Sequence, residues 1–219
     1  MSTVISKDNL DNIFFNLAKR IQKQLKHFNV VLYITGGANL VHGTLHREST
    51  LDIDVLKQRS IDLRDIIVDM CNEFDLPYNW LNDSVMYSAS YSNKLSTYVG
   101  DERTFCNCLT VKYIKDEAIC AMKLKANRVV KDDMLDVLFT VVEKDISLND
   151  VDKIYKDLYN EDLDANLFVT LVKASSIFKE YKRVFNVSNI RLEYERLSGI
   201  LGIVDMHDLA MEVADTFLN

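Results

Sequence analysis

The stretch VLYITGGANLVHGTLHRESTLDIDVL, residues 31–56, decides the fold, because an apolar run ends at a glycine pair and two closely spaced aspartates follow. Asp52 and Asp54 are one residue apart and alternate with apolar side chains. In a β-strand, residues two apart project from the same face, so both carboxylates are expected on one face. Two like charges there are unfavourable unless a cation neutralises them. The pattern predicts a site for Mg²⁺ or Mn²⁺, which favour hard oxygen ligands.

The glycine pair, Gly36 and Gly37, stands between a predicted strand at 30–34 and a predicted short helix that ends near residue 45. Glycine at such a turn permits a positive φ and lets the backbone approach a ligand closely. The first turn of the helix then offers free N–H groups and a positive dipole end to an anion. A phosphate-binding turn beside paired aspartates indicates phosphoryl or nucleotidyl transfer.

The order strand, Gly-Gly, short helix, arginine and Asp-x-Asp resembles the nucleotidyltransferase superfamily that includes DNA polymerase β. Within it, HRESTLDIDV at 46–55 is similar to the matching segment of the abortive-infection type nucleotidyltransferase toxins and of a related bacterial family of uncharacterised nucleotidyltransferase-like proteins. LPYNWLND at 76–83 and AMKLKANRVVKDDMLD at 121–136 are similar to segments of that second family. The resemblance covers roughly residues 28–145.

Arg47 and Ser49 lie in the polar loop before the aspartates. The resemblance implies that this loop binds the nucleotide, with the forked guanidinium of Arg47 on the triphosphate. The alternative is that Arg47 is an ordinary surface arginine.

The third segment contributes Lys123, Arg128, Asp132 and Asp136. The resemblance implies catalytic roles for Lys123 and Asp136 beside Asp52 and Asp54, and a phosphate-binding role for Arg128. The alternative is a salt-bridge network between helices, since residues three or four apart share a helix face.

In the superfamily a third carboxylate often comes from a later strand. The strand expected to supply it, at 105–114, contains no acidic residue, and Asp101 and Glu102 only precede it. A one-metal enzyme or an inactive relative therefore stays open beside the two-metal mechanism.

Composition predicts a packed protein of the cytoplasm. Of 219 residues, 48% are hydrophobic and only one is proline, which argues against long flexible linkers. No run of apolar residues reaches membrane-spanning length, and the polar start is unlike a signal peptide. The four cysteines are expected as reduced thiols, with Cys106 and Cys108 in a strand. The net charge of −7 argues against a broad nucleic-acid surface.

The expected fold class is α+β. A nucleotidyltransferase-like mixed β-sheet with flanking helices is expected in residues 1–145, with Ser6 capping the first helix, and an all-helical part in 146–219. Strands are predicted at 30–34 and 51–56 and within a Tyr-, Val- and Thr-rich region at 84–114. Apolar spacing predicts helices at 7–28, 61–74, 116–127, 131–144, 148–159, from 162 or 164 to 185, 190–201 and 205–217.

The predicted function is metal-dependent transfer of a nucleoside monophosphate from a triphosphate to an acceptor, which could be tRNA, a protein or a small molecule. If the resemblance to the toxins extends further, it implies a phage-defence pair with an antitoxin partner. The alternative is a catalytically inactive nucleotide-binding or interaction module. Metal-dependent binding of one nucleoside triphosphate, with release of pyrophosphate, would distinguish the enzyme from the module.

Overall fold

The computed structural model describes residues 3–25, 28–56, 62–128 and 132–218. The chain divides into two compact units, the first made of Met1–Gly43 and Arg47–Ile119, the second of Thr44–His46 and Cys120–Asn219. The predicted domain boundary at residue 145 is not tested by this division and stays a prediction. The predicted helix positions at 26–27, 61 and 131 lie outside the described residues.

A five-stranded mixed sheet forms the centre of the first unit, with the strand order β5-β4-β2-β7-β6. The central strand β2 is antiparallel to β4 and parallel to β7, and β6 and β7 form an antiparallel hairpin. The strands are β2 (Val30–Thr35), β4 (Ile53–Leu56), β5 (Leu81–Asn82), β6 (Val99–Phe105) and β7 (Leu109–Ile114). A separate short pair joins β1 (Ile5–Ser6) to β3 (Ser49–Thr50).

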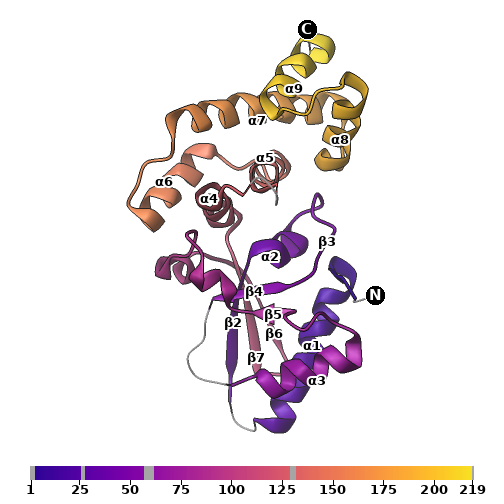
Figure 1. Cartoon of the computed structure of the whole chain (residues 1–219), viewed down its shortest axis with the longest axis vertical. Coiled ribbons are helices and arrows are strands. Elements are labelled where there is room, and N and C mark those ends of the chain that lie inside the picture. Colours follow the sequence, from indigo (N-terminus) through magenta and orange to yellow (C-terminus); the bar gives the residue numbers. More distant parts are fainter. Residues whose placement is uncertain (1–2, 26–27, 57–61, 129–131, 219) are drawn as a thin grey trace. The chain divides into compact units, whose positions relative to one another are not determined.

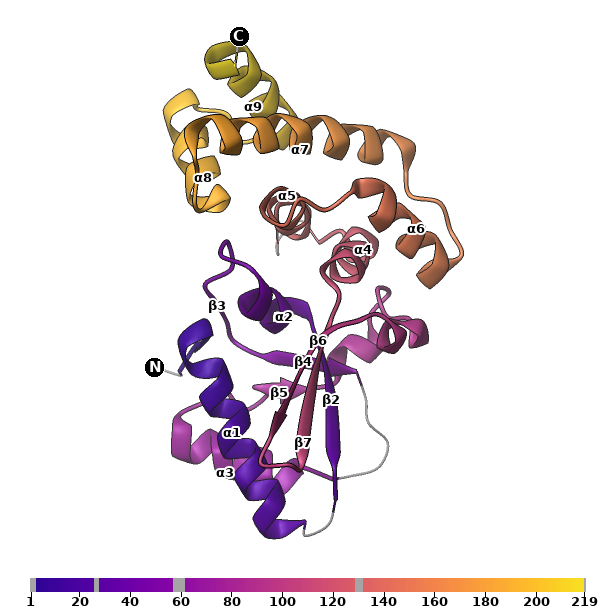
Figure 2. The ribbon, with the colours of Figure 1, turned by 180° about the vertical axis from the view of Figure 1, so that it is seen from behind.

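One face of this sheet is covered by α1 (Lys7–Gln24) and α3 (Arg64–Phe74), as Figure 1 and the reverse view in Figure 2 show. In β2, β4 and β7, alternate residues point into the core that these helices complete, whereas β6 has no buried residue. This core contains Ile34, Ile53, Val111, Phe14 and Met70. As expected, Ser6 begins α1 in a capping box, where the Ser6 N–H donates to Asn9 Oδ1 at 2.9 Å.

The short helix α2 (Gly36–Gly43) follows β2 without a connecting loop. Its Asn39 is buried, and its side-chain amide bonds both backbone groups of Ile114, the last residue of β7. The Asn39 Nδ2 donates to the Ile114 carbonyl at 2.9 Å, and the Ile114 N–H donates to Asn39 Oδ1 at 2.8 Å. These two bonds fix the helix to the end of the sheet.

The sequence prediction of β-structure is wrong for residues 84–97, which form the 3₁₀ helices η1 (Ser84–Tyr87) and η2 (Asn93–Thr97). Hydroxyl groups bond the backbone locally there: the Ser88 hydroxyl donates to the Val85 carbonyl at 2.6 Å, and the Thr97 hydroxyl to the Lys94 carbonyl at 2.7 Å. Such local bonds give the backbone an alternative to a strand ladder.

The expected strand position of Cys106 and Cys108 is also wrong, because they lie in the turn between β6 and β7. Cys106 and Asn107 have φ values of 48° and 54°, and the Cys108 N–H donates to the Phe105 carbonyl. Phe105 pairs with Leu109, so three residues connect the two strands, and the two consecutive positive φ values turn the chain with the hand that suits a hairpin.

The second unit is helical, and its helices agree closely with the predicted ranges. Its core includes Phe139, Phe178, Tyr194 and Leu209. None of the described helices is both long and apolar enough to cross a bilayer. The helices are α4 (Asp116–Ala126, in this unit from Cys120), α5 (Asp133–Glu143), α6 (Leu148–Tyr159), α7 (Ala165–Phe185), α8 (Ile190–Leu201) and α9 (Met206–Val213), followed by a π-helical turn at Ala214–Leu218. The fold class, a mixed sheet with flanking helices and a helical C-terminal part, is confirmed.

Candidate functional site

The first glycine of the turn and the second aspartate lie against each other. Asp54 pairs with Thr35 across β2 and β4, and Gly36 follows Thr35 with φ +64°. A Cβ atom placed on Gly36 would lie 2.5 Å from Asp54 Oδ2, closer than side chains pack. Both the positive φ and this close approach therefore require glycine at position 36.

The aspartate pair keeps the expected strand alternation. Ile53 is fully buried in the core, while Asp52 and Asp54 on either side of it are half-buried. Asp52 directly precedes β4 and accepts a long hydrogen bond of 3.4 Å from the Thr50 hydroxyl. The two carboxylates therefore lie on the side of the strand opposite Ile53.

The second glycine lies beside Arg47 and Thr50. A Cβ atom on Gly37 would lie 2.8 Å from Thr50 Oγ1 and 3.7 Å from Arg47 Nη2. Ser49 precedes Thr50 in β3 and pairs with Ser6. The structure thus brings Gly36, Gly37, Arg47 and Asp54 together in the first unit, and adds Thr50, which the sequence analysis did not select.

The strand next to Asp54 on its outer side is β5, and not the strand at 105–114 that was considered as the source of a third carboxylate. Asp54 pairs in parallel register with Asn82, whereas β7 is separated from β4 by β2. The Asn82 side chain accepts from the Ser84 N–H at 2.9 Å and donates to the Asn79 carbonyl at 3.1 Å. An amide therefore occupies the position beside Asp54, and the half-buried Asp83 follows it. This strand lies within LPYNWLND, one of the segments similar to the uncharacterised family, but no strand was predicted there.

The donor set suits a metal ion that arrives with a nucleotide. Within the described part of the chain, no group of three or more His, Cys, Asp or Glu side chains is placed to hold a metal ion. Mg²⁺ in nucleotide enzymes is usually held by one or two carboxylates together with water and substrate phosphates. Asp52 and Asp54 beside a glycine turn match that ligand set.

The predicted residues Lys123, Arg128 and Asp136 lie in the second unit, in a network of charges whose carboxylates and Lys123 are buried and whose Arg128 is half exposed. The Lys123 ammonium donates to Asp133 at 3.0 Å and to Asp136 at 2.7 Å. The backbone N–H and the guanidinium of Arg128 also donate to Asp133, at 3.1, 2.8 and 3.2 Å. Burial acts to raise the pKa of Asp133, but the bonds from Arg128 and the charge of Lys123 outweigh it and hold this pKa below its usual range.

In the same unit, the carboxylate of Glu143 accepts hydrogen bonds from two consecutive backbone N–H groups. Glu143 accepts from the N–H groups of Leu45 and His46, at 2.6 and 3.1 Å, and from His46 Nδ1 at 3.1 Å. Burial acts to raise the pKa of Glu143, but these bonds outweigh it and lower the pKa. His46 Nε2 lies 3.9 Å from Asp136 Oδ1, so Glu143 and His46 extend the network around Lys123. Sequence reasoning missed Asp133 and Glu143.

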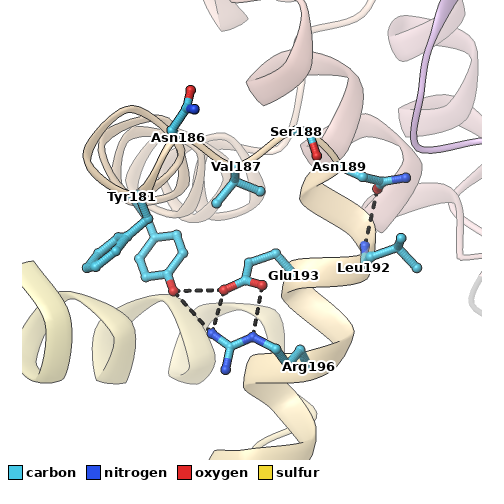
Figure 3. Close-up of a pocket in the computed structure, with 9 residues that line it drawn as sticks. Tyr181, Asn186, Val187, Ser188, Asn189, Leu192, Glu193 and Arg196 are labelled. Carbon is cyan, nitrogen blue, oxygen red and sulfur yellow. Dashed lines mark hydrogen bonds and ion pairs between the residues drawn. The ribbon is translucent and has the colours of Figure 1, made fainter.

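A separate hollow of about 480 Å³ lies in the second unit where α7 ends and α8 begins (Figure 3). The Tyr181 hydroxyl donates to Glu193 at 2.8 Å, and Arg196 Nε donates to the same carboxylate at 2.9 Å. Arg196 lowers the pKa of Glu193. Tyr181, Glu193 and Arg196 therefore bond one another, and none of the predicted site residues lines the hollow.

Comparison with known families and proteins supports the resemblance. The family described as "Nucleotidyltransferase of unknown function (DUF6036)" matches residues 8–185. That span contains the sheet, the glycine turn, both aspartates and the charge network, and it ends with α7. No curated protein and no solved structure matches the chain.

Proposed function

Because the chain belongs to this nucleotidyltransferase family of unknown function, we propose that it transfers a nucleoside monophosphate from a nucleoside triphosphate to an acceptor. In this reaction a hydroxyl oxygen of the acceptor forms a bond to the α-phosphorus and loses its proton. The bond between the α-phosphorus and the oxygen leading to the β-phosphate breaks, and pyrophosphate leaves.

The packing of Asp54 against Gly36 is the observation that carries this proposal. It places a carboxylate at the turn whose backbone can approach a phosphate, with Asp52 on the same side of the strand. Asp52 and Asp54 would hold Mg²⁺ or Mn²⁺, which stabilises negative charge on the phosphates when bound. The N–H groups at Gly36 and Gly37 and the guanidinium of Arg47 would bind the triphosphate, with Ser49 in the same loop.

The roles of the second unit and the choice of acceptor are further parts of the proposal. Lys123 and Asp136 are proposed as catalytic residues and Arg128 as a phosphate-binding residue, and the bonds that fix their side chains support preorganised roles. The acceptor would be tRNA, a protein hydroxyl or a small molecule.

A cytoplasmic toxin with an antitoxin partner is the biological role that the resemblance suggests. Slower growth of bacteria expressing the wild type, but not Asp52→Asn, would support that role, and equal growth would contradict it.

The decisive experiment measures pyrophosphate release with Mg²⁺ and each of ATP, CTP, GTP and UTP, with total tRNA or the protein itself as acceptor. We expect release from at least one nucleotide, and its loss in Asp52→Asn and Asp54→Asn. Asp69→Asn is the matched control, because Asp69 is exposed on α3. Undiminished release in both site variants would refute the assignment.

A second candidate function, a catalytically inactive nucleotide-binding module, is favoured by one observation. The position beside Asp54 on β5 is occupied by the amide of Asn82, which supplies no charge to a second metal ion. This candidate predicts metal-dependent nucleotide binding without turnover. Detection of pyrophosphate release would exclude it.

A further inference from the structure

The sheet face that carries Asp54 continues into a partly exposed polar surface. Thr35 pairs with Asp54, and Tyr33, two residues earlier in β2, projects from the same face. Tyr33 pairs in turn with Lys112 of β7, and Lys112 pairs with Glu102 of β6. Directly paired residues share a face, so this face runs from Asp54 to Glu102 across four neighbouring strands.

Burial distinguishes the middle of this face from the face under α1 and α3, although Thr35 and Leu56, which lie on the same face, are buried. Val31, Tyr33, Thr110 and Lys112 are half-buried, whereas the residues that alternate with them are buried in the core. In Figures 1 and 2, α1 and α3 lie on the core side of these strands. An aromatic ring and polar groups are therefore accessible on the side of the sheet that carries the candidate phosphate site.

Three side chains meet on this surface. The Lys112 ammonium lies 5.8 Å from the centre of the Tyr33 ring and 3.3 Å from the Glu102 carboxylate. The Lys112 side chain is 28% exposed and that of Glu102 is 55% exposed. The Lys112 ammonium thus lies over the Tyr33 ring and pairs with the Glu102 carboxylate, so one strong hydrogen-bond donor and one strong acceptor lie at the aromatic side chain.

We propose that Tyr33, Lys112 and Glu102 form a platform that binds a nucleobase. The base stacks on the Tyr33 ring, and the ammonium and the carboxylate bond the acceptor and donor atoms on the base edge. The proposal rests on the proposed nucleotidyl transfer and deepens it, because it assigns the part of the site that recognises the base.

The distance along β2 between Tyr33 and the glycine turn fits a nucleotide that binds its phosphates at the turn and its base at Tyr33. Successive residues of a strand rise by about 3.3 Å, so Tyr33 lies roughly 7 Å along β2 from Thr35. A separation of this order allows one nucleotide to place its phosphates near Asp54 and its base over Tyr33. The charges also fit: a neutral base needs both a donor and an acceptor, and the Lys112–Glu102 pair supplies both without a net charge.

The test measures dissociation constants with Mg²⁺ for six probes: inorganic tripolyphosphate, the four nucleoside triphosphates, and a short single-stranded RNA without nucleotide. The variants are Tyr33→Leu, which removes the ring, and Tyr33→Phe, which keeps it. Lys112→Gln and Glu102→Gln each remove one charge of the pair, and Asp54→Asn tests the phosphate site. Unfolding curves of each variant confirm that it is folded.

We expect Tyr33→Leu to weaken binding of at least one triphosphate by about 5- to 150-fold, the range for loss of one stacked base. Tripolyphosphate binding stays the same, Tyr33→Phe restores the affinity, and the two Gln variants change the ranking of the four bases. The same loss with the RNA, but not with the triphosphates, would assign the base to the acceptor.

Equal binding of the triphosphates and the RNA by wild type and Tyr33→Leu would overturn the platform. Failure of the proposed function has a different signature, because tripolyphosphate would then bind Asp54→Asn as tightly as the wild type. The two results are independent, since tripolyphosphate carries no base.

Discussion

Asn39 and Ile114, 75 residues apart in the chain, bond each other as two paired strand residues would, with one side-chain amide replacing a peptide group. Both partners are buried, so no water can replace these bonds. The amide attaches the helix after the glycine turn to the end of β7, and its loss should therefore affect both stability and the site.

Asn39→Ala is expected to lower the free energy of unfolding by about 3 kcal/mol, because the buried N–H and C=O of Ile114 both lose a partner. Asn39→Asp keeps the acceptor but loses the donor, so its loss should be at least as large, because a carboxylate would face the Ile114 carbonyl. Urea unfolding followed by circular dichroism measures both. A loss below about 0.5 kcal/mol for Asn39→Ala would contradict the buried pair.

Gly36→Ala is expected to destabilise the protein by about 1–2 kcal/mol and to abolish nucleotide binding, because alanine is strained at φ +64° and its Cβ meets Asp54 Oδ2. Gly199→Ala is the matched control. Nothing lies within 4 Å of a Cβ at position 199, which is inside α8, so the same change there should stabilise by up to about 1 kcal/mol. Thermal unfolding tests the opposite signs, and equal shifts would contradict the prediction.

Lys123→Met is expected to cost about 3–5 kcal/mol, because it leaves the buried carboxylates of Asp133 and Asp136 without the ammonium between them. Lys125→Met, on the same helix, removes a partly exposed ammonium that pairs with the exposed Glu161, and should cost at most about 1 kcal/mol. Urea unfolding of both variants compares the two sites. Similar losses would argue against a buried network.

Glu143 should stabilise the folded protein at neutral pH and lose this contribution as the pH becomes acidic. Its folded pKa is depressed, so its contribution is fully present above the ordinary value of 4.5 and is lost as the pH falls through the folded pKa. Glu143→Gln should therefore destabilise the protein by about 1.5–3 kcal/mol at pH 7 and by progressively less below pH 4.5. Urea unfolding across this range tests the prediction, and a difference that grows on acidification would have the wrong sign.

Local signals were enough to predict most elements and the centre of the candidate site. The ranges of α6 and α8 agree with the predicted ranges because apolar spacing defines their lengths. The approach of Gly36 to Asp54 followed from the glycine pair and the Asp-x-Asp spacing. Each of these signals lies within a few residues of the feature it predicts.

The errors concern features that leave no repeating pattern of apolar residues in the nearby sequence. The strand β5 has only two residues, too few to show alternation, so its place beside Asp54 could not be read from the sequence. Asp132, and not Asp133, was selected from the resemblance, because Asp132 and Asp136 lie one helical turn apart. In the structure Asp132 has φ +52° before the helix begins, and Asp133 is the buried residue. The Leu45 N–H donates to the carboxylate of Glu143, 98 residues later in the chain, and no local sequence pattern predicts a bond over that separation.

That last bond has a consequence for the order in which the chain can fold during synthesis. Thr44–His46 lies in the sequence between two parts of the first unit, yet it belongs to the second. Leu45 and His46 leave the ribosome 98 and 97 residues before Glu143 does. At about 5–20 residues per second, their N–H groups wait roughly 5–20 s for that partner. The segment between α2 and the two aspartates therefore reaches its final structure only after the ribosome has made α5.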